Sequence, residues 1–193
     1  MFMKFIGAIK KYFANLGMLL PNERSWHASF IGEIAKQMRP SAYLELGVYR
    51  GETFRKVAKW SAVSVGLDID PVAIKSISGL KKSIPVLGDI SALDARADLP
   101  GVYDLIFIDA DHAKESVVSD FKAASDLLKR NGLILLHDTW PKNESYTTPG
   151  FCGDAYLAVG VLRSSCPDWS FVTLAAHPGL TFCQKNSALP LSN

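Results

Sequence analysis

The chain has 193 residues, enough for one domain with a full hydrophobic core, and we expect a single domain over residues 1–193. Its formal net charge of +2 is close to balance, so bulk charge does not favour nucleic acid or an anionic membrane as a partner. The three cysteines lack C-x-x-C spacing, which disfavours a disulfide framework and a structural zinc site; we therefore expect a reducing, cytoplasmic location.

Residues 1–40 are predicted to form an N-terminal helical segment. Residues 1–20 have apolar side chains on one helical face, and lysines interrupt every apolar run, so we expect neither a signal peptide nor a transmembrane span here. This helix is expected to pack on its own domain or on a second copy, giving a homodimer; a membrane-surface helix is the alternative. A second helix over residues 26–38 ends before Pro40.

Apolar, strand-favouring runs then alternate five times with helical patterns. This alternation predicts a parallel sheet with helices on both faces, and two last strands around His177-Pro-Gly179 add an antiparallel hairpin. The predicted strands cover 43–48, 62–67, 84–87, 103–108, 133–136, 169–174 and 180–183; the helices begin at 52 and 71 and cover 113–130 and 154–163. The tail over 186–193 is expected to be frayed.

All five parallel strands end in acidic or histidine residues. Ligands of such sheets bind beyond the carboxyl ends of the strands, so these side chains are predicted to form one site. The loop over 140–152 is rich in proline, glycine and threonine, is longer than most connections, and is predicted to cover it. The predicted cluster consists of Glu45, Asp68, Asp89, Asp109, His112, His137 and Asp138.

A glycine turn, Gly47 to Gly51, follows the first strand. Glycine permits a positive φ and lets a ligand approach the backbone, while the free N–H groups of the next helix favour a carboxylate. The spacing differs from the G-x-G-x-x-G of dinucleotide sites, and Glu45 would repel a pyrophosphate. The turn is a candidate cofactor site; an ordinary structural turn after a buried strand is the alternative.

These motifs resemble those of the class I S-adenosylmethionine-dependent methyltransferases, over residues 43 to 184. Glu45-Leu-Gly-Val-Tyr-Arg-Gly-Glu-Thr53 is similar to the first motif of the catechol and caffeoyl-CoA O-methyltransferases. Ile108-Asp-Ala-Asp-His112 and His137-Asp-Thr139 are similar to segments of the macrolide-sugar O-methyltransferases. The resemblance implies an α/β, Rossmann-like fold with a seven-stranded methyltransferase sheet, and a cofactor-binding core over residues 41–185.

The resemblance also implies how S-adenosyl-L-methionine is bound. Gly47 and Gly51 would give the methionine part access to the backbone, and Thr53 would bond to its carboxylate. Asp68 would hold both ribose hydroxyls, since a carboxylate accepts two hydrogen bonds from a cis-diol, and Asp89 would accept from the adenine amino group. The other implied cofactor-binding residues are Glu45 near the sulfonium, Tyr49, Ile69 and Asp109.

The strand-end ligands of cation-dependent relatives correspond to Asp109, Asp138 and either His137 or Thr139. The resemblance thus implies a site for Mg²⁺ or another divalent cation at Asp109, His137 and Asp138. Carboxylates and waters suit Mg²⁺, whereas a histidine ligand shifts the preference toward a transition metal. The alternative is that His137 is only a hydrogen-bonded residue beside the site.

Methyl transfer is an in-line displacement, so the acceptor oxygen must be aligned and must lose its proton. We predict His112 as the base, because an imidazole with an ordinary pKa accepts a proton at neutral pH, with Asp109 beside it. Lys114 is the alternative base if its pKa is depressed. The other alternative is that His112 is exposed to water and takes no part in the reaction.

The expected function is O-methylation of a small-molecule hydroxyl, sugar or phenolic, with assistance from Mg²⁺. A domain that binds the cofactor without catalysis is one alternative. A nucleotide- or NAD-dependent enzyme is another, and it would need the G-x-G-x-x-G fingerprint that the sequence lacks. We expect no nucleic-acid partner, because no basic stripe with interleaved aromatic residues is present.

Overall fold

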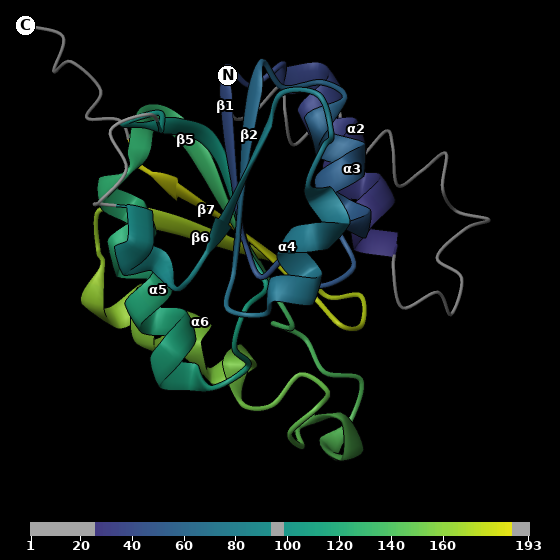
Figure 1. Cartoon of the computed structure of the whole chain (residues 1–193). Helices are drawn as coiled ribbons and strands as arrows, with labels where there is room; N and C mark the ends of the chain where they lie inside the picture. Colours follow the sequence, from purple (N-terminus) through teal and green to yellow (C-terminus); the bar gives the residue numbers. More distant parts are fainter. Residues whose placement is uncertain (1–25, 94–98, 187–193) are drawn as a thin grey trace, which may run out of the picture.

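The computed structural model describes residues 26–93 and 99–186, which form one seven-stranded sheet with helices on both faces (Figure 1). The strand order is β3-β2-β1-β4-β5-β7-β6; β1 to β5 are parallel, and β7 is antiparallel to both β5 and β6. This confirms the predicted fold class. The strands are β1 (Ala42–Leu46), β2 (Val63–Asp68), β3 (Ser83–Leu87), β4 (Tyr103–Ile108), β5 (Leu128–His137), β6 (Trp169–Leu174) and β7 (Leu180–Lys185).

Helices α2, α3 and α4 cover one face of the sheet, and α5 and α6 cover the other (Figure 1). None of the helices in the described ranges is long and apolar enough to cross a membrane. The helix predicted over residues 1–20, and with it the dimer contact, lies outside the described residues. The helices are α2 (Trp26–Met38), α3 (Glu52–Ala58), α4 (Pro71–Ile77), α5 (Lys114–Asp126) and α6 (Ala155–Ser165), with 3₁₀ turns η1 (Ile90–Leu93) and η2 (Glu144–Tyr146).

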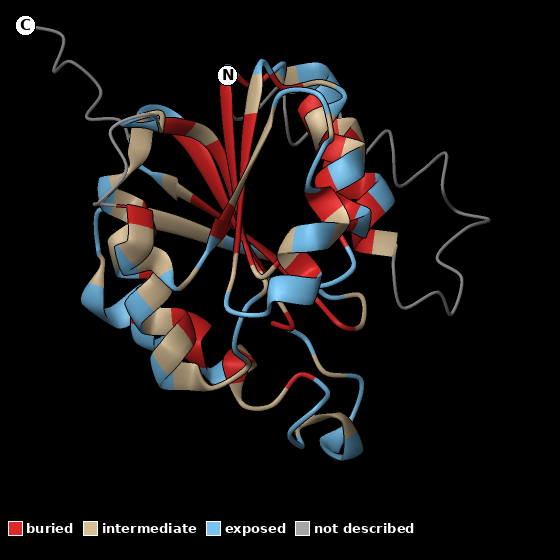
Figure 2. Cartoon of the chain, in the orientation of Figure 1, coloured by how far each residue is buried: buried red, intermediate tan, exposed pale blue. Residues whose placement is uncertain are grey.

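The central strands are buried on both faces, as their continuous apolar sequences predict (Figure 2). Leu44 and Ile106 pack in the layer with α5 and α6, whereas Tyr43 and Phe107 pack in the layer with α2, α3 and α4. Burying each such side chain contributes about 1.5–3 kcal/mol. The two layers hold the parallel strands in register, so that their carboxyl ends meet at one edge.

The prediction of a helix over residues 113–130 is wrong at the C-terminal end, because α5 ends at Asp126 and β5 already begins at Leu128. Tyr103 of β4 pairs with Leu128 before the register shifts at an irregularity in the strand pair. Apolar residues at helical spacing continued past the true end of the helix. Pairing with a buried neighbouring strand outweighed that local pattern.

Asn131 and Gly132, which follow the predicted helix over 113–130, lie in the irregular part of β5. A Cβ on Gly132 would lie 2.7 Å from Leu128 Cδ1, so glycine permits this close packing. In the same stretch the Lys129 amine lies 3.0 Å from both carboxylate oxygens of Asp104. These contacts bind the start of β5 to β4.

The glycine turn after β1 packs directly on the backbone that follows β4. Gly47 has a φ of +84°, and a Cβ there would lie 2.1 Å from the carbonyl oxygen of Asp109. The Gly47 N–H donates to Leu67 O at 2.9 Å, and the Asp109 N–H donates to Leu46 O at 2.8 Å. Only glycine fits here, and its absence of a side chain brings the ends of β1, β2 and β4 together.

Gly47→Ala is expected to lower the free energy of unfolding by about 3 kcal/mol or more, since the new methyl group meets rigid backbone in a left-handed conformation. Gly79→Ala is the matched control: its φ is +82°, but no atom lies within 4 Å of the added Cβ. We expect it to cost about 1 kcal/mol from backbone strain alone. Urea denaturation measures both, and equal losses would contradict the close-packing argument.

Candidate active site

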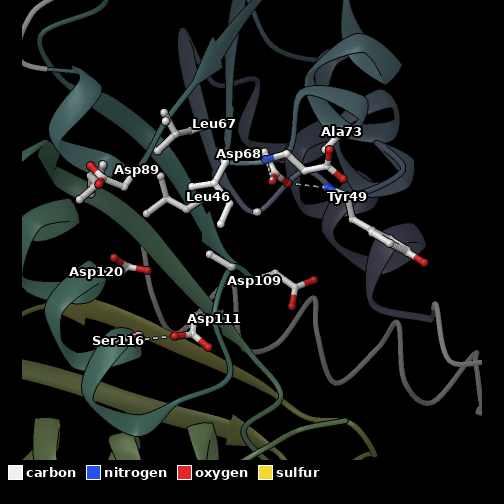
Figure 3. Close-up of a pocket in the computed structure, with 16 residues that line it drawn as sticks. Leu46, Tyr49, Leu67, Asp68, Ala73, Asp89, Asp109, Asp111, Ser116 and Asp120 are labelled. Atoms are coloured by element: carbon white, nitrogen blue, oxygen red, sulfur yellow. Dashed lines mark hydrogen bonds between the residues drawn. The ribbon is translucent and has the colours of Figure 1, made fainter. Parts of the chain in front are cut away.

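Two cavities open at the carboxyl ends of the strands and share part of their walls. The first, of about 390 Å³, lies among the ends of β1, β2 and β3 and the start of α5 (Figure 3). The second, of about 530 Å³, lies between the ends of β4 and β5 and the loop over 140–152. Tyr49, Asp109 and Ala110 line both cavities. A molecule in one cavity is therefore next to a molecule in the other.

Asp68, at the end of β2, lies in the wall of the first cavity and accepts hydrogen bonds from the glycine turn (Figure 3). Its Oδ2 accepts from the backbone N–H groups of Val48 and Tyr49, both at 2.9 Å, and its Oδ1 accepts from Asp70 N–H at 2.9 Å. The side chain thereby fixes the turn and carries a negative charge at the cavity. Ile69 also lines this wall.

Asp89 also lines the first cavity, directly before η1. Its Oδ1 accepts from the N–H of Ser91 at 2.9 Å and from its hydroxyl at 2.5 Å, and these hydrogen bonds hold the pKa of Asp89 below its ordinary value. Asp111 and Asp120 add two carboxylates, and Asp111 accepts from the Ser116 hydroxyl at 2.6 Å (Figure 3). The cavity is strongly acidic and suits a cationic ligand.

Three of the predicted cofactor residues are buried and do not line either cavity: Glu45, Gly51 and Thr53. Glu45 is buried; it is bonded to the Tyr43 hydroxyl at 2.5 Å and to the backbone N–H of Phe54. Burial raises the pKa of Glu45 well above its ordinary value. Glu45 supports the turn from beneath. The other predicted cofactor residues line the first cavity: Gly47, Tyr49, Asp68, Ile69, Asp89 and Asp109.

The three predicted metal ligands come together at the second cavity. Nδ1 of His137 lies 2.8 Å from Asp109 Oδ1 and 3.2 Å from Asp138 Oδ2. His112 joins them, with Nε2 3.0 Å from Asp138 Oδ2 and 3.8 Å from Asp109 Oδ1. Each carboxylate is therefore close to two imidazoles. This arrangement can hold a cation or exchange protons.

The carboxylates strongly perturb both imidazoles. A hydrogen bond to Asp109 and the charge of Asp138 raise the pKa of His112 to about 9. Burial lowers the pKa of His137, but the charges and hydrogen bonds of Asp109 and Asp138 outweigh it and raise that pKa to about 10. Burial opposes ionisation of Asp109, yet the charge of His137 holds its pKa well below the ordinary value. The predicted ordinary pKa of His112 is therefore wrong.

His27 belongs to the same cluster, and the sequence interpretation missed it. It lies on α2, and its Nδ1 is 3.0 Å from Nε2 of His137. Burial lowers the pKa of His27 to about 3, so the neutral ring accepts a hydrogen bond from His137. In the sequence His27 is one residue of an amphipathic helix. Only the packing of α2 on the sheet, where His27 lies beside Phe107, brings it to the site.

Lys114, the alternative base, is not brought to either cavity. Its amine lies 2.8 Å from the carboxylate of Glu115. This hydrogen bond and charge raise the pKa of Lys114, whereas a base would need a lowered one. Its backbone N–H donates to Asp154.

The loop over 140–152 forms an aromatic wall of the second cavity, with Tyr146 and Phe151 beside His177. Tyr146 packs edge-on against His177, with ring centroids 4.3 Å apart, and against Phe151 at 5.3 Å. Nδ1 of His112 contacts the carbonyl oxygen of Phe151. A small molecule in this cavity would contact these aromatic side chains as well as His112 and Asp109.

A family model described as a methyltransferase domain matches residues 44–139. PaMTH1, a methyltransferase of Podospora anserina solved with S-adenosylhomocysteine, is 19% identical, with a TM-score of 0.70 over 93% of this chain and 88% of that one. An O-methyltransferase of Bacillus cereus, also solved with S-adenosylhomocysteine, is 14% identical, with a TM-score of 0.69 over 93% and 90%.

TomG of Streptomyces achromogenes, an O-methyltransferase involved in tomaymycin synthesis and solved with S-adenosylmethionine, is 14% identical, with a TM-score of 0.66 over 83% of this chain and 80% of that one. At these identities the likeness shows the fold. Together with the family match, it assigns the chain to the class I S-adenosylmethionine-dependent methyltransferases. The predicted family is confirmed.

The environment of Glu45 predicts a pH-dependent contribution to stability. Its pKa is higher in the folded state than in the unfolded chain, so the stabilisation is complete below the unfolded pKa and is lost as pH rises through the folded pKa. Glu45→Gln has no proton to lose. As pH rises from the unfolded pKa to the folded pKa of Glu45, the free energy of unfolding of Glu45→Gln should increase relative to that of the wild type, by up to about 1.4 kcal/mol for each pH unit.

Urea denaturation of both proteins at about pH 5 and about pH 8 tests this expectation. Glu52→Gln is the control, because Glu52 is an exposed carboxylate on the neighbouring helix α3. A Glu45→Gln difference that does not change with pH would show that this carboxyl has the same pKa in the folded and unfolded chain.

Proposed function

We propose that the chain transfers the methyl group of S-adenosyl-L-methionine to a hydroxyl oxygen of a small-molecule acceptor, a sugar or a phenol. The observation that carries this proposal is the pair of cavities that meet at Asp109. The first has an acidic wall and the second has proton-binding groups beside an aromatic wall. Such a pair suits a cationic methyl donor next to a neutral acceptor.

In this proposal the cofactor occupies the first cavity. Its sulfonium is attracted by the carboxylates there, and its methionine part lies against the Gly47 turn, where no side chain blocks the backbone. Asp68 binds the ribose hydroxyls, and Asp89 lies beside the adenine. Glu45 and Thr53 are buried and do not line this cavity, so neither contacts the cofactor in this proposal.

The acceptor occupies the second cavity and loses its proton to His112. The reaction breaks the bond from sulfur to the methyl group, forms a bond from oxygen to that methyl group, and leaves S-adenosylhomocysteine. Nε2 of neutral His112 takes the hydroxyl proton, and Asp138, 3.0 Å away, stabilises the imidazolium that forms. Because its pKa is about 9, only a small fraction of His112 is neutral at pH 7.

Asp109, His137 and Asp138 would hold a divalent cation at the boundary of the two cavities. The residues fit such an ion, because oxygen atoms of both carboxylates converge within 3.2 Å of one ring nitrogen of His137. When bound, the cation would lower the pKa of the acceptor hydroxyl. The three side chains would also fix the orientation of the acceptor.

Calorimetric titration tests the cofactor. We expect one-to-one binding of S-adenosylhomocysteine and none of NAD⁺. Asp68→Ala should weaken binding about 10–100-fold, since it removes a charged hydrogen-bond acceptor worth about 1.5–3 kcal/mol. Asp126→Ala, an exposed acid at the end of α5, is the control and should bind as wild type does. No binding of S-adenosylhomocysteine would refute the proposal.

A transfer assay with labelled S-adenosylmethionine and a panel of phenols and sugars tests the chemistry. His112→Ala should reduce kcat by about 10²–10⁴ and leave the affinity for S-adenosylhomocysteine unchanged, because it removes only the proton acceptor. Lys122→Ala, an exposed lysine on α5, controls for surface substitution. Full turnover by His112→Ala would assign the base elsewhere.

A further inference from the structure

Two sets of ligand-forming side chains in the described residues share Asp109. The outer site comprises Asp109, His112 and Asp138 and faces the second cavity; the inner site comprises His27, Asp109 and His137. In each set, one ligand atom from every residue lies within 4.8 Å of the others. The inner site is not part of the resemblance described above, because His27 lies on α2, before the matched segment.

The inner site is built around two ring nitrogens that face each other. His27 Nδ1 lies 3.0 Å from His137 Nε2, the nitrogen opposite the one that contacts the carboxylates. Two imidazole nitrogens bound to one tetrahedral ion at about 2.0–2.1 Å lie about 3.3 Å apart. To bind one ion, the two nitrogens would have to separate by a few tenths of an ångström, and the rings would have to turn so that both lone pairs point at the ion.

The fold holds both rings in this orientation. His27 is 8% exposed, and its ring packs against Phe107 at a centroid distance of 6.1 Å. Trp26, its neighbour on α2, donates from Nε1 to the carbonyl oxygen of His177 at 2.8 Å. The opposite nitrogen of His137 is fixed by Asp109 at 2.8 Å, the carboxylate contact that orients many metal-binding histidines.

The donor set of the inner site selects the class of metal. Two imidazole nitrogens, one of them on a ring that Asp109 orients, suit zinc, cobalt, iron or nickel in the divalent state. Mg²⁺ prefers oxygen ligands and retains several waters, which a buried pair of imidazoles does not favour. The carboxylates of Asp109 and Asp138 together are better ligands for a hard cation.

We propose that His27 and His137 bind a divalent transition-metal ion, with Asp109 orienting His137 from its opposite nitrogen, and that this inner site ties α2 to the end of β5. This inference rests on the proposed function, because Asp109 and His137 also belong to the cation site proposed there. Its test reads metal binding alone, so the two can fail separately: a chain that binds S-adenosylhomocysteine but no Co²⁺ refutes only this inference.

The test is a titration of the chelator-treated full-length chain with Co²⁺, followed by visible absorption. We expect one Co²⁺ per chain with the intense bands of low coordination number, no displacement by a large excess of Mg²⁺, and displacement by Zn²⁺. His27→Asn keeps a polar atom near the Nδ1 position but is a poor ligand, so it should weaken Co²⁺ binding at least about 100-fold. His177→Asn removes a histidine outside both sites and should bind Co²⁺ as wild type does.

Three outcomes would overturn the inference. The first two are no Co²⁺ binding by the wild type and ready displacement of Co²⁺ by Mg²⁺. The third is that His27→Asn binds Co²⁺ as the wild type does while His112→Asn does not, since the ion would then lie in the outer site. Circular dichroism checks that each variant is folded. If His27→Asn does not fold, X-ray absorption of the cobalt-loaded wild type decides: two imidazole nitrogens are expected, and fewer than two refute the inner site.

Discussion

The contact between the Gly47 turn and the backbone of Asp109 is the constraint on which the site depends. A Cβ on Gly47 would lie 2.1 Å from the Asp109 carbonyl oxygen, so the ends of β1 and β4 can meet only at glycine. Asp68 extends the same junction to β2 through two hydrogen bonds of 2.9 Å to the turn. The junction forms one wall of the first cavity and directs Asp109 toward the second. Both proposed ligand positions therefore follow from one packing contact.

The charged groups at this junction are stable because each balances another. Asp109 and Asp138 would be costly to bury alone, but each lies next to the imidazoles of His112 and His137. The same pairing raises the pKa of both histidines and holds that of Asp109 low. Protons and a cation would thus compete for one set of atoms. His27 extends the network into the layer between α2 and the sheet.

The sequence predicted the sheet, its parallel core and the strand-end acids, because buried strands and glycine turns have strong local patterns. It predicted that Asp109, His137 and Asp138 would come together, because the carboxyl ends of parallel strands meet at one edge of the sheet. It did not predict His27, whose role depends on how α2 packs, nor the early end of α5, where strand pairing outweighs helical spacing. The pKa of His112 also required the structure, since two carboxylates from different strands set it.

The central claim is that the cofactor occupies the first cavity, against the turn that Asp68 fixes. Hydrogen exchange with and without S-adenosylhomocysteine tests this most directly, because it reports on individual backbone amides. The account predicts slower exchange over residues 46–51 and 67–70, with no change over β6 at the edge of the sheet. Unchanged exchange in those two segments, under conditions where the ligand is bound, would contradict it.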